Sequence, residues 1–448
     1  MKRKWIKHIL ILLCVLALGG ISLFGVRQFW FNPYRGTVSA FRPSERLDTI
    51  LSGPQAVADL DYIVARLKER HPACIHGLPD KMQTEYKKER QRLTASPGVS
   101  VLSLWQSAAR LLAILGDAHT SVGVEYLDGK HLPLSFRWEQ DTLYCLGSQY
   151  SSYAVVQIGG IAVADLYQKF LEQFSFELEA WARHSFASRL TRGEYLSFLG
   201  VDTEGEISIV LADTKNSDHI TIGFSLHERI EDGADKTEGD FEYVLDLAAG
   251  VGIFSLYHCV YNEEYKEGLL DFFMQVQDND ILSVIVDLRG NPGGDSRVAN
   301  EFVRYLPVDS YLTMTTEVRE GPIIWKNKSR QQENPRLEPA FTGDVYVLTS
   351  SDTFSAAMDF AVLISDNGLG KVIGESPGNM PSSYGDVLYF QTPNAGLAFT
   401  VSYKYFLRPD VSKRDLPLIP DIEVPAEDAL TEALRLIGMT SDIQAGEI

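Results

Sequence analysis

The sequence has little cysteine, and outside its first eight positions it has no block of basic residues. Its four Cys, at positions 14, 74, 145 and 259, are too widely spaced for a disulfide-stapled framework. There is no low-complexity tract, and 45% hydrophobic against 23% charged residues excludes a disordered, collagen-like or coiled-coil chain. A net charge of −19 argues against nucleic acid as a partner. The 448 residues should therefore form a globular protein of two or three domains.

The N-terminus has the pattern of a membrane-targeting segment. Residues 1–8 carry four bases and no acid, and residues 9–26 are 18 positions without a charge. This pattern predicts a cytoplasmic basic segment over 1–8 and a transmembrane signal anchor over 9–26, with one pass through the cell membrane and an extracytoplasmic body. A cleaved signal peptide is the alternative, disfavoured because no clear A-x-A site follows the apolar run. A lipoprotein signal at Cys14 is disfavoured because Leu13 stands where a small residue is required.

The rest of the chain divides into four segments by its pattern. Residues 27–54 mix Pro, Gly and aromatics without a period and predict a linker. Helical spacing of apolar residues predicts a helical domain over 55–125, and short alternating runs between turns predict a β-rich domain over 126–245. From 246 to 448 strands alternate with helices, which predicts an α/β core with buried, largely parallel strands.

A glycine-rich turn follows a buried strand within the segment 284–296, VIVDLRGNPGGDS. Gly293 and Gly294 allow a turn too tight for residues with a Cβ, and the backbone N–H groups of such a turn are able to face an anion. An ordinary strand-to-helix turn is the alternative for this segment taken alone. A nucleotide-phosphate loop is disfavoured because no Gly-Lys-Ser/Thr follows.

A serine stands at a second strand-to-helix junction, in LTSSDTFSAAMDFA at 348–361. Ser355 is followed by Ala356 and Ala357, which are small enough for a substrate backbone to approach, and this setting suits a nucleophile. Helix capping by Ser355 is the alternative reading of this segment alone.

The candidate base among the nine His is His119, in LGDAHTS at 115–121, where its neighbours are small and polar. His258 lies within a strand pattern and suits a structural position. His71, Cys74 and His76 form a loose cluster without a second ligand pair, so no metal site is expected there.

These segments together resemble the carboxyl-terminal-processing (tail-specific) serine peptidases and their tricorn-type relatives. The matching motifs occur in the family's order: D-x-H-T at 117–120, VIVDLRGNPGG at 284–294, TFSAAMDFA at 353–361, VIGE at 372–375 and PDIEV at 420–424. The resemblance implies a Clp/crotonase-like superhelical α/β catalytic core with Ser355 as nucleophile, preceded by an N-terminal helical cap and a PDZ-like middle domain. For the PDZ-like module, the similar stretch is YAVVQIGGIAVADLYQKF at 153–170.

One departure from the family pattern bears on the base. Many processing peptidases use a Ser–Lys dyad with the Lys 25 residues after the Ser, but Met380 occupies that position here. Lys371 starts a strand pattern and suits a solvated edge charge. The resemblance to the tricorn-type branch instead implies a Ser–His–acid arrangement with His119 as base. The implied acid is Asp415, where relatives commonly have Glu, with Asp410 and Asp421 as rivals.

The resemblance therefore implies a serine endopeptidase, a hydrolase of peptide or protein substrates that works through an acyl-enzyme without a metal or cofactor. Its oxyanion hole would use backbone N–H groups of Gly293 or Gly294 and of Ala356. A catalytically inactive peptidase-like peptide-binding protein is the main alternative, and hydrolysis of a non-peptide ester or amide is a third reading.

Overall fold

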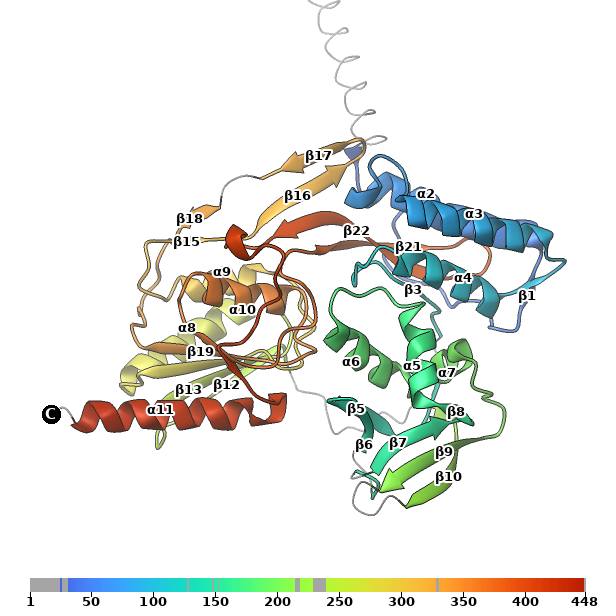
Figure 1. Ribbon diagram of the computed structural model, residues 1–448. Coiled ribbons are helices and arrows are strands. Elements are labelled where there is room, and N and C mark those ends of the chain that lie inside the picture. Colours follow the sequence, from blue (N-terminus) through green and yellow to red (C-terminus); the bar gives the residue numbers. More distant parts are fainter. Residues whose placement is uncertain are drawn as a thin grey trace, which may run out of the picture.

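The computed structural model describes residues 25, 31–126, 129–146, 149–151, 153–213, 218–228, 239–327 and 330–446, with side chains up to 438 (Figure 1). The predicted basic segment 1–8 and all but one residue of the predicted anchor 9–26 lie outside the described residues. Within the described part of the chain, no helix combines the length and the apolar character that a membrane crossing requires.

Three helices form the N-terminal region, where the sequence predicted a helical domain over 55–125: α2 (Gly53–Arg70), α3 (Asp80–Ala95) and α4 (Val101–Ala113). Helix α2 begins with a capping box, because Ser52 and Gln55 each accept a hydrogen bond from the other's backbone N–H. It ends at His71, because the following Pro72 is incompatible with a continued helix.

The middle region is an antiparallel sheet partly covered by helices. Its strand order is β10-β9-β7-β6-β5, with β8 paired to β7. The strands are β5 (Ser135–Glu139), β6 (Thr142–Leu146), β7 (Tyr153–Ile158), β8 (Ile161–Ala162), β9 (Glu206–Asp213) and β10 (His219–Ser225). The helices are α5 (Val163–Leu171), α6 (Glu179–Arg189) and α7 (Gly193–Leu199). Ile207, Ile209 and Leu211 alternate with less buried residues along β9, which places one face of the sheet in the core.

The α/β core is built on a six-stranded sheet of order β12-β13-β14-β19-β20-β23. Only the β12 pairing is antiparallel, as expected for buried strands joined by helices. The strands are β12 (Phe241–Asp246), β13 (Val251–Leu256), β14 (Ser283–Asp287), β19 (Asp344–Thr349), β20 (Lys371–Gly374) and β23 (Ile422–Glu423). The predicted boundary at 245/246 has to move towards the N-terminus, because β12 is the edge strand of the core sheet and not part of the β-rich domain.

Helices cover both faces of this sheet (Figure 1). The helices on one face are α8 (Glu263–Asp278), α9 (Arg297–Val303) and α10 (Ala356–Asp366), and α11 (Ala429–Gly446) lies on the other. The mixed α/β class predicted from the sequence is confirmed by this arrangement.

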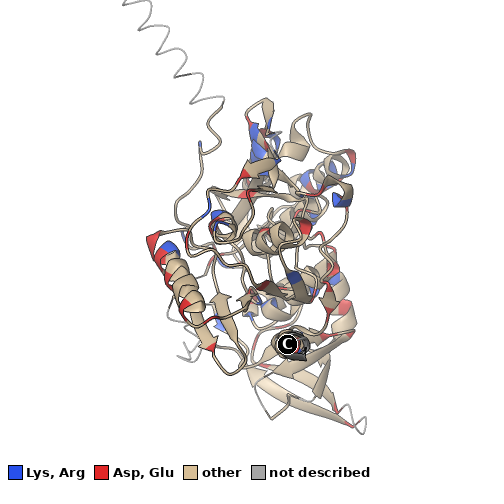
Figure 2. Ribbon diagram, turned by 90° about the vertical axis from the view of Figure 1, so that its left-hand side faces the viewer, with Lys and Arg blue, Asp and Glu red and all other residues tan. Residues whose placement is uncertain are grey.

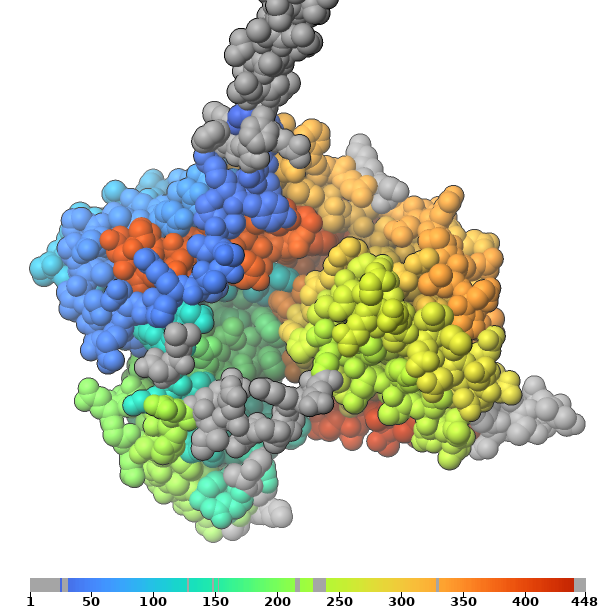
Figure 3. Space-filling view, turned by 180° about the vertical axis from the view of Figure 1, so that it is seen from behind, coloured from blue at the N-terminus to red at the C-terminus, as the bar shows by residue number. Residues whose placement is uncertain are grey.

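A third sheet joins the N-terminal region to strands from the C-terminal part of the chain. Its order is β17-β16-β22-β21, with β3 paired to β22. These strands are β3 (Val122–Gly123), β16 (Thr315–Glu320), β17 (Ile323–Lys326), β21 (Tyr384–Gln391) and β22 (Ala398–Leu407). The side chains of Leu388, Phe390 and Phe399 share one core with those of helices α2 and α4. Figure 3 shows the result, with orange C-terminal atoms set among the blue N-terminal ones.

The predicted linker packs against the same C-terminal hairpin. The N–H of Val38 donates to the carbonyl of Tyr389, and the N–H of Glu45 donates to the carbonyl of Ala395. The Ser44 side chain is buried and donates to the carbonyl of Gly396. Residues 31–49 are thus an integral part of the N-terminal region, and not a spacer that stands free of it.

Charged residues of both signs occur side by side along the ribbon (Figure 2). Several of their ion pairs lie at the surface and contribute little to stability, such as Arg90 with Asp61. The pair of Arg408 and Asp366 differs, because their side chains are 3% and 0% exposed. Removal of either partner would leave a buried charge, so this pair fixes the end of β22 against α10.

Candidate active site

Ser355 stands where the loop after β19 enters α10, and its backbone conformation is unusual. Its φ is +55° and its ψ is −122°, a region that residues with a side chain rarely occupy. The side chain makes no capping hydrogen bond, so the capping alternative does not hold. Strain of this kind persists only where the surroundings enforce it, and it concentrates at functional sites.

Asn379 is one of the groups that enforce this conformation. Its Oδ1 accepts a 2.7 Å hydrogen bond from the backbone N–H of Ser355, and its Nδ2 donates to Ser383 Oγ at 3.3 Å. The residue is 1% exposed. The stretch where many relatives carry a dyad Lys thus supplies a structural amide next to Ser355. Lys371 is exposed at the first position of β20, as expected for an edge charge.

The glycine turn after β14 lies directly against Ser355. A Cβ built on Gly293, whose φ is +99°, would lie 2.8 Å from Ser355 Cβ and 2.9 Å from the nitrogen of Ala356. Real Cβ atoms essentially never come that close to another heavy atom, so this approach of the two segments requires glycine.

Two of the three predicted oxyanion donors have free N–H groups. The N–H of Gly293 donates to Asn291 Oδ1 at 2.8 Å, which corrects the prediction for that residue. No described residue accepts a hydrogen bond from the N–H of Gly294 or of Ala356. Both residues line the same cavity as Ser355, so their N–H groups are available to a ligand there.

His119 lies in the loop between α4 and β3, and its side chain is 11% exposed. Neither ring nitrogen has a hydrogen-bond partner, although both are buried. The ring packs on Phe354 at a centroid distance of 4.7 Å, and Trp181 of α6 also stacks on Phe354, at 4.2 Å. Burial lowers the pKa of His119, which keeps the imidazole neutral and able to accept a proton at pH 7.

Asp117 is the acid nearest to His119 in sequence, and it is fully buried. Its Oδ1 accepts the backbone N–H of His119 at 2.9 Å, and its Oδ2 pairs with His71 Nε2 at 3.1 Å. Oδ1 lies 3.8 Å from His119 Nδ1, which is beyond hydrogen-bond length. Burial raises the pKa of Asp117, but the hydrogen bond and charge of His71 outweigh it and bring the pKa to about 2. Asp117 is therefore an ionised group that fixes the backbone of His119.

Glu177 is a second carboxyl group beside His119, and the sequence analysis missed it. Its Oε1 accepts the N–H of Ala118 at 3.1 Å, while its buried Oε2 has no partner. Burial, followed by the charge of Asp117, raises the pKa of Glu177 to about 8. It precedes α6 in an irregular stretch that gives no sequence signal. Ligand atoms of Asp117, His119 and Glu177 lie within 4.8 Å of one another, so among the described residues these three form a group that could hold a metal ion.

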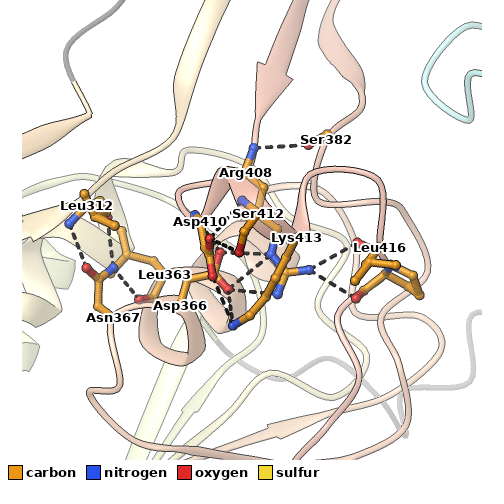
Figure 4. A network of polar contacts seen from close by, with 11 residues as sticks. Leu312, Leu363, Asp366, Asn367, Ser382, Arg408, Asp410, Ser412, Lys413 and Leu416 are labelled. Carbon is orange, nitrogen blue, oxygen red and sulfur yellow. Dashed lines mark hydrogen bonds and ion pairs between the residues drawn. The ribbon is translucent and has the colours of Figure 1, made fainter.

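Asp415, the acid implied by the resemblance, does not reach the site. Its side chain is 91% exposed, and its ion-pair partner is the neighbouring Arg414 at 3.8 Å. The rivals are also engaged elsewhere. Asp410 Oδ1 accepts hydrogen bonds from Ser412 beside the buried pair of Arg408 and Asp366 (Figure 4), and Asp421 accepts the N–H of Val372. The prediction of Asp415 as the acid is therefore replaced by the carboxyl groups that flank His119.

Ser355 and His119 line one cavity of about 420 Å³, together with Gly294, Ala356 and Asn379. This cavity brings together a serine hydroxyl, an imidazole with free ring nitrogens and two free backbone N–H groups. Such a set is able to remove a proton from a hydroxyl and to stabilise an oxyanion.

Comparisons with known proteins agree with this description. The family model described as peptidase family S41 matches residues 251–424. A crystal structure of mature CPAF superposes with a TM-score of 0.64 at 14% identity, over 86% of this chain and 96% of that chain. Mature CPAF complexed with lactacystin gives 0.62 at 13% identity, over 88% and 98%. The photosystem II D1 C-terminal processing protease gives 0.47 at 14% identity, over 86% and 97%.

The likeness to the two CPAF structures shows that the fold is shared along most of both chains. The match over 251–424 includes the glycine turn, Ser355 and the Pro-Asp ending that carried the resemblance in the sequence. The predicted resemblance to the carboxyl-terminal-processing serine peptidases is confirmed: residues 251–424 match peptidase family S41, and this match supports a serine-type peptidase.

Proposed function

We propose that this chain is a membrane-anchored endopeptidase with Ser355 as nucleophile and His119 as general base. The observation that carries the proposal is the shared cavity, in which the unbonded imidazole of His119 and the strained Ser355 occur with two free N–H groups. This set of groups matches the Ser–His arrangement implied by the tricorn-type resemblance, and it uses no lysine.

The mechanism that follows is acyl transfer. His119 takes the hydroxyl proton while Ser355 Oγ forms a bond to the peptide carbonyl carbon. The N–H groups of Gly294 and Ala356 hold the oxyanion, each contributing about 3 kcal/mol in comparable sites. The C–N bond then breaks, and the imidazolium gives its proton to the departing amine. A water molecule, deprotonated by His119, hydrolyses the acyl-enzyme and restores Ser355.

The acid role is assigned to the two carboxyl groups that flank His119. Asp117 fixes the backbone of His119, and its ionised carboxylate favours the imidazolium that forms during the reaction. Glu177 has a free oxygen in the same cluster, and the ionised form of Glu177 would accept a ring N–H. Asp415 has no part in the mechanism.

The proposed location rests on the sequence of residues 1–26. Four bases followed by an uncharged run of 18 residues place the peptidase body outside the cytoplasm if the run is retained as an anchor. The substrate is then a peptide or protein on that side of the membrane.

Fluorophosphonate labelling of the full-length chain in detergent tests the proposal. Wild type is expected to label, and Ser355→Ala and His119→Ala are expected to lose at least about 99% of the labelling rate, since general-base assistance alone contributes about 10²–10⁴-fold. Ser351→Ala, in the same loop, is the matched control and should label normally. Because burial lowers the pKa of His119, protonation of His119 itself should reduce labelling only on acidification below its ordinary value of 6.5.

Three results would contradict the proposal or part of it. A folded wild-type chain that does not label would favour the catalytically inactive, peptide-binding alternative. Labelling that persists in His119→Ala but not in Ser355→Ala would keep the nucleophile and remove the assigned base. Cleavage of esters without cleavage of peptides would favour the non-peptide hydrolase.

A further inference from the structure

One carboxyl group in the cavity has no part in the proposed chemistry. Asp359 lies one helical turn after Ser355 in α10, and its backbone N–H donates to the Ser355 carbonyl at 2.9 Å. Its side chain lines the cavity. No described residue donates a hydrogen bond to the carboxyl group of Asp359 or forms an ion pair with it.

The basic side chains of the cavity already have acidic partners. Arg297 makes hydrogen bonds with both oxygens of Asp295, at 3.0 and 2.9 Å from its Nε, and lies 4.5 Å from the ring of Tyr261. Lys404 forms an ion pair with Asp386. Among the described charged residues that line this cavity, Asp359 is thus the acid that has no basic partner.

Asp386 lines the same cavity as Asp359. It lies in β21 with a φ of +55°, while the flanking pairs Gly385↔Lys404 and Val387↔Ser402 keep the register of the strand. Burial, followed by the charge of Asp386, raises the pKa of Asp359 to about 7. A cation placed between the two carboxyl groups would favour the ionised form of Asp359.

The walls around this acid suit a long side chain with a charged end. Tyr384 and Phe406 line the same cavity, and aromatic rings pack well against the methylene stem of Lys or Arg. Four residues of helix separate Asp359 from Ser355, which is about 6 Å along the axis. A lysine or arginine side chain spans a separation of this order from a carbonyl held at Ser355.

We propose that Asp359, supported by Asp386, selects substrates with Lys or Arg as the residue that supplies the scissile carbonyl. This inference rests on the proposed function, and it adds a substrate class to it. Asp359 is a specificity residue in this account, because it binds the substrate side chain and takes no part in proton transfer.

Diphenyl phosphonate probes with lysine-like, leucine-like and glutamate-like side chains test this selection on the full-length chain. The lysine-like probe is expected to label Ser355 at least about tenfold faster than the leucine-like probe, as a charge-assisted hydrogen bond allows. In Asp359→Asn this ratio should fall to about one, and Asp359→Glu should restore part of it. The exposed Asp344→Asn is the matched control and should keep the wild-type ratio.

The two kinds of probe test the substrate selection and the proposed function separately. Plain fluorophosphonate reports on Ser355 and His119 alone, so normal labelling of Asp359→Asn by this probe shows a folded and reactive site. The leucine-like probe reacting fastest with wild type, or a ratio unchanged in Asp359→Asn, would overturn the selection and leave the proposed function standing. A wild type that resists plain fluorophosphonate would overturn both.

Discussion

The two sides of the active-site cavity are built differently. On the nucleophile side, the backbone of Ser355 is fixed by Asn379 and by the contact with Gly293, and its φ of +55° is enforced by this packing. On the base side, the backbone of His119 is fixed, because its carbonyl accepts Thr400 Oγ1 at 2.6 Å, but its ring nitrogens bind nothing. The position of Ser355 thus depends on backbone packing, whereas the properties of the His119 ring depend on its buried polar surroundings.

This difference predicts which kind of substitution should impair each side of the cavity. A change of shape should damage the nucleophile side, and a change of charge should damage the base side. Both sides depend on the segment from Asn379 to Ser402, which begins at the amide that fixes Ser355 and ends where Thr120 Oγ1 accepts the N–H of Ser402.

Gly293→Ala should produce the largest effect, because it changes shape on the nucleophile side. Its Cβ would meet Ser355 Cβ at 2.8 Å and would sit at a φ of +99°. A displacement of about 1 Å at the reacting group costs about 10²-fold in rate, and we expect at least this loss in fluorophosphonate labelling.

Gly368→Ala is the matched control for this variant. Gly368 also has a positive φ, of +62°, but nothing lies within 4 Å of a Cβ built there. It should lose about 1 kcal/mol of stability and keep its labelling rate. Equal labelling rates in Gly293→Ala and wild type would contradict a nucleophile set by the contact of the two backbones.

Glu177→Gln should produce an intermediate effect, because it changes charge on the base side. The pKa of Glu177 is about 8 in the folded protein against an ordinary 4.5. If the ionised group orients His119, wild-type labelling should rise as the pH passes through about 8, and Glu177→Gln should lack this rise. At pH 9 the variant should be slower by about tenfold, since a hydrogen bond to a charged group contributes about 1.5–3 kcal/mol. Glu179→Gln, with an exposed side chain two residues later, should follow wild type.

The same variant should be more stable than wild type above pH 4.5. Between pH 4.5 and about 8 the unfolded chain has released the proton of Glu177 and the folded chain has kept it, so folding is penalised as the pH rises through this window. Glutamine removes the penalty, and at pH 7 the gain is at most about 3 kcal/mol by the conversion of pKa units to free energy. Thermal melts at pH 4 and pH 7 measure it, and a Tm gain that is equal at both values would contradict the buried, protonated Glu177.

Asp415→Asn should produce the smallest effect. Its side chain is 91% exposed, and exposed ion pairs such as that with Arg414 contribute about 0–1 kcal/mol. We expect labelling and Tm equal to wild type, measured beside Glu177→Gln. A loss of labelling as large as that of His119→Ala would return the acid role to Asp415.

The sequence predicted those parts of the site whose signals are local. A buried strand before a glycine turn and a serine at a helix start are patterns within a dozen residues, and both β14 with Gly293 and α10 with Ser355 form as expected. His119 could be selected by its small polar neighbours. These features could be predicted because they depend on short-range steric effects, which residues adjacent in the sequence determine.

The parts that could not be predicted depend on contacts between distant segments. Glu177 approaches His119 from an irregular stretch, and nothing in that stretch indicates burial. Asp415 was inferred from the resemblance, and a shared position along the sequence does not say which way a loop turns. The edge strand β12 alternates like the strands of the middle region, so its pairing with β13 could not be read from its pattern.

The insertion of the β21–β22 hairpin into the N-terminal core has a consequence for biosynthesis. Ala398 pairs with Gly123, and Phe399 packs in the core of the first helices. The N-terminal half therefore lacks a strand and part of its interior until residue 407 has left the ribosome. Because His119 is bonded to this same strand through Thr400, a chain that lacks β22 has no assembled site, and proteolytic competence arises only after residue 407 has been synthesised and released.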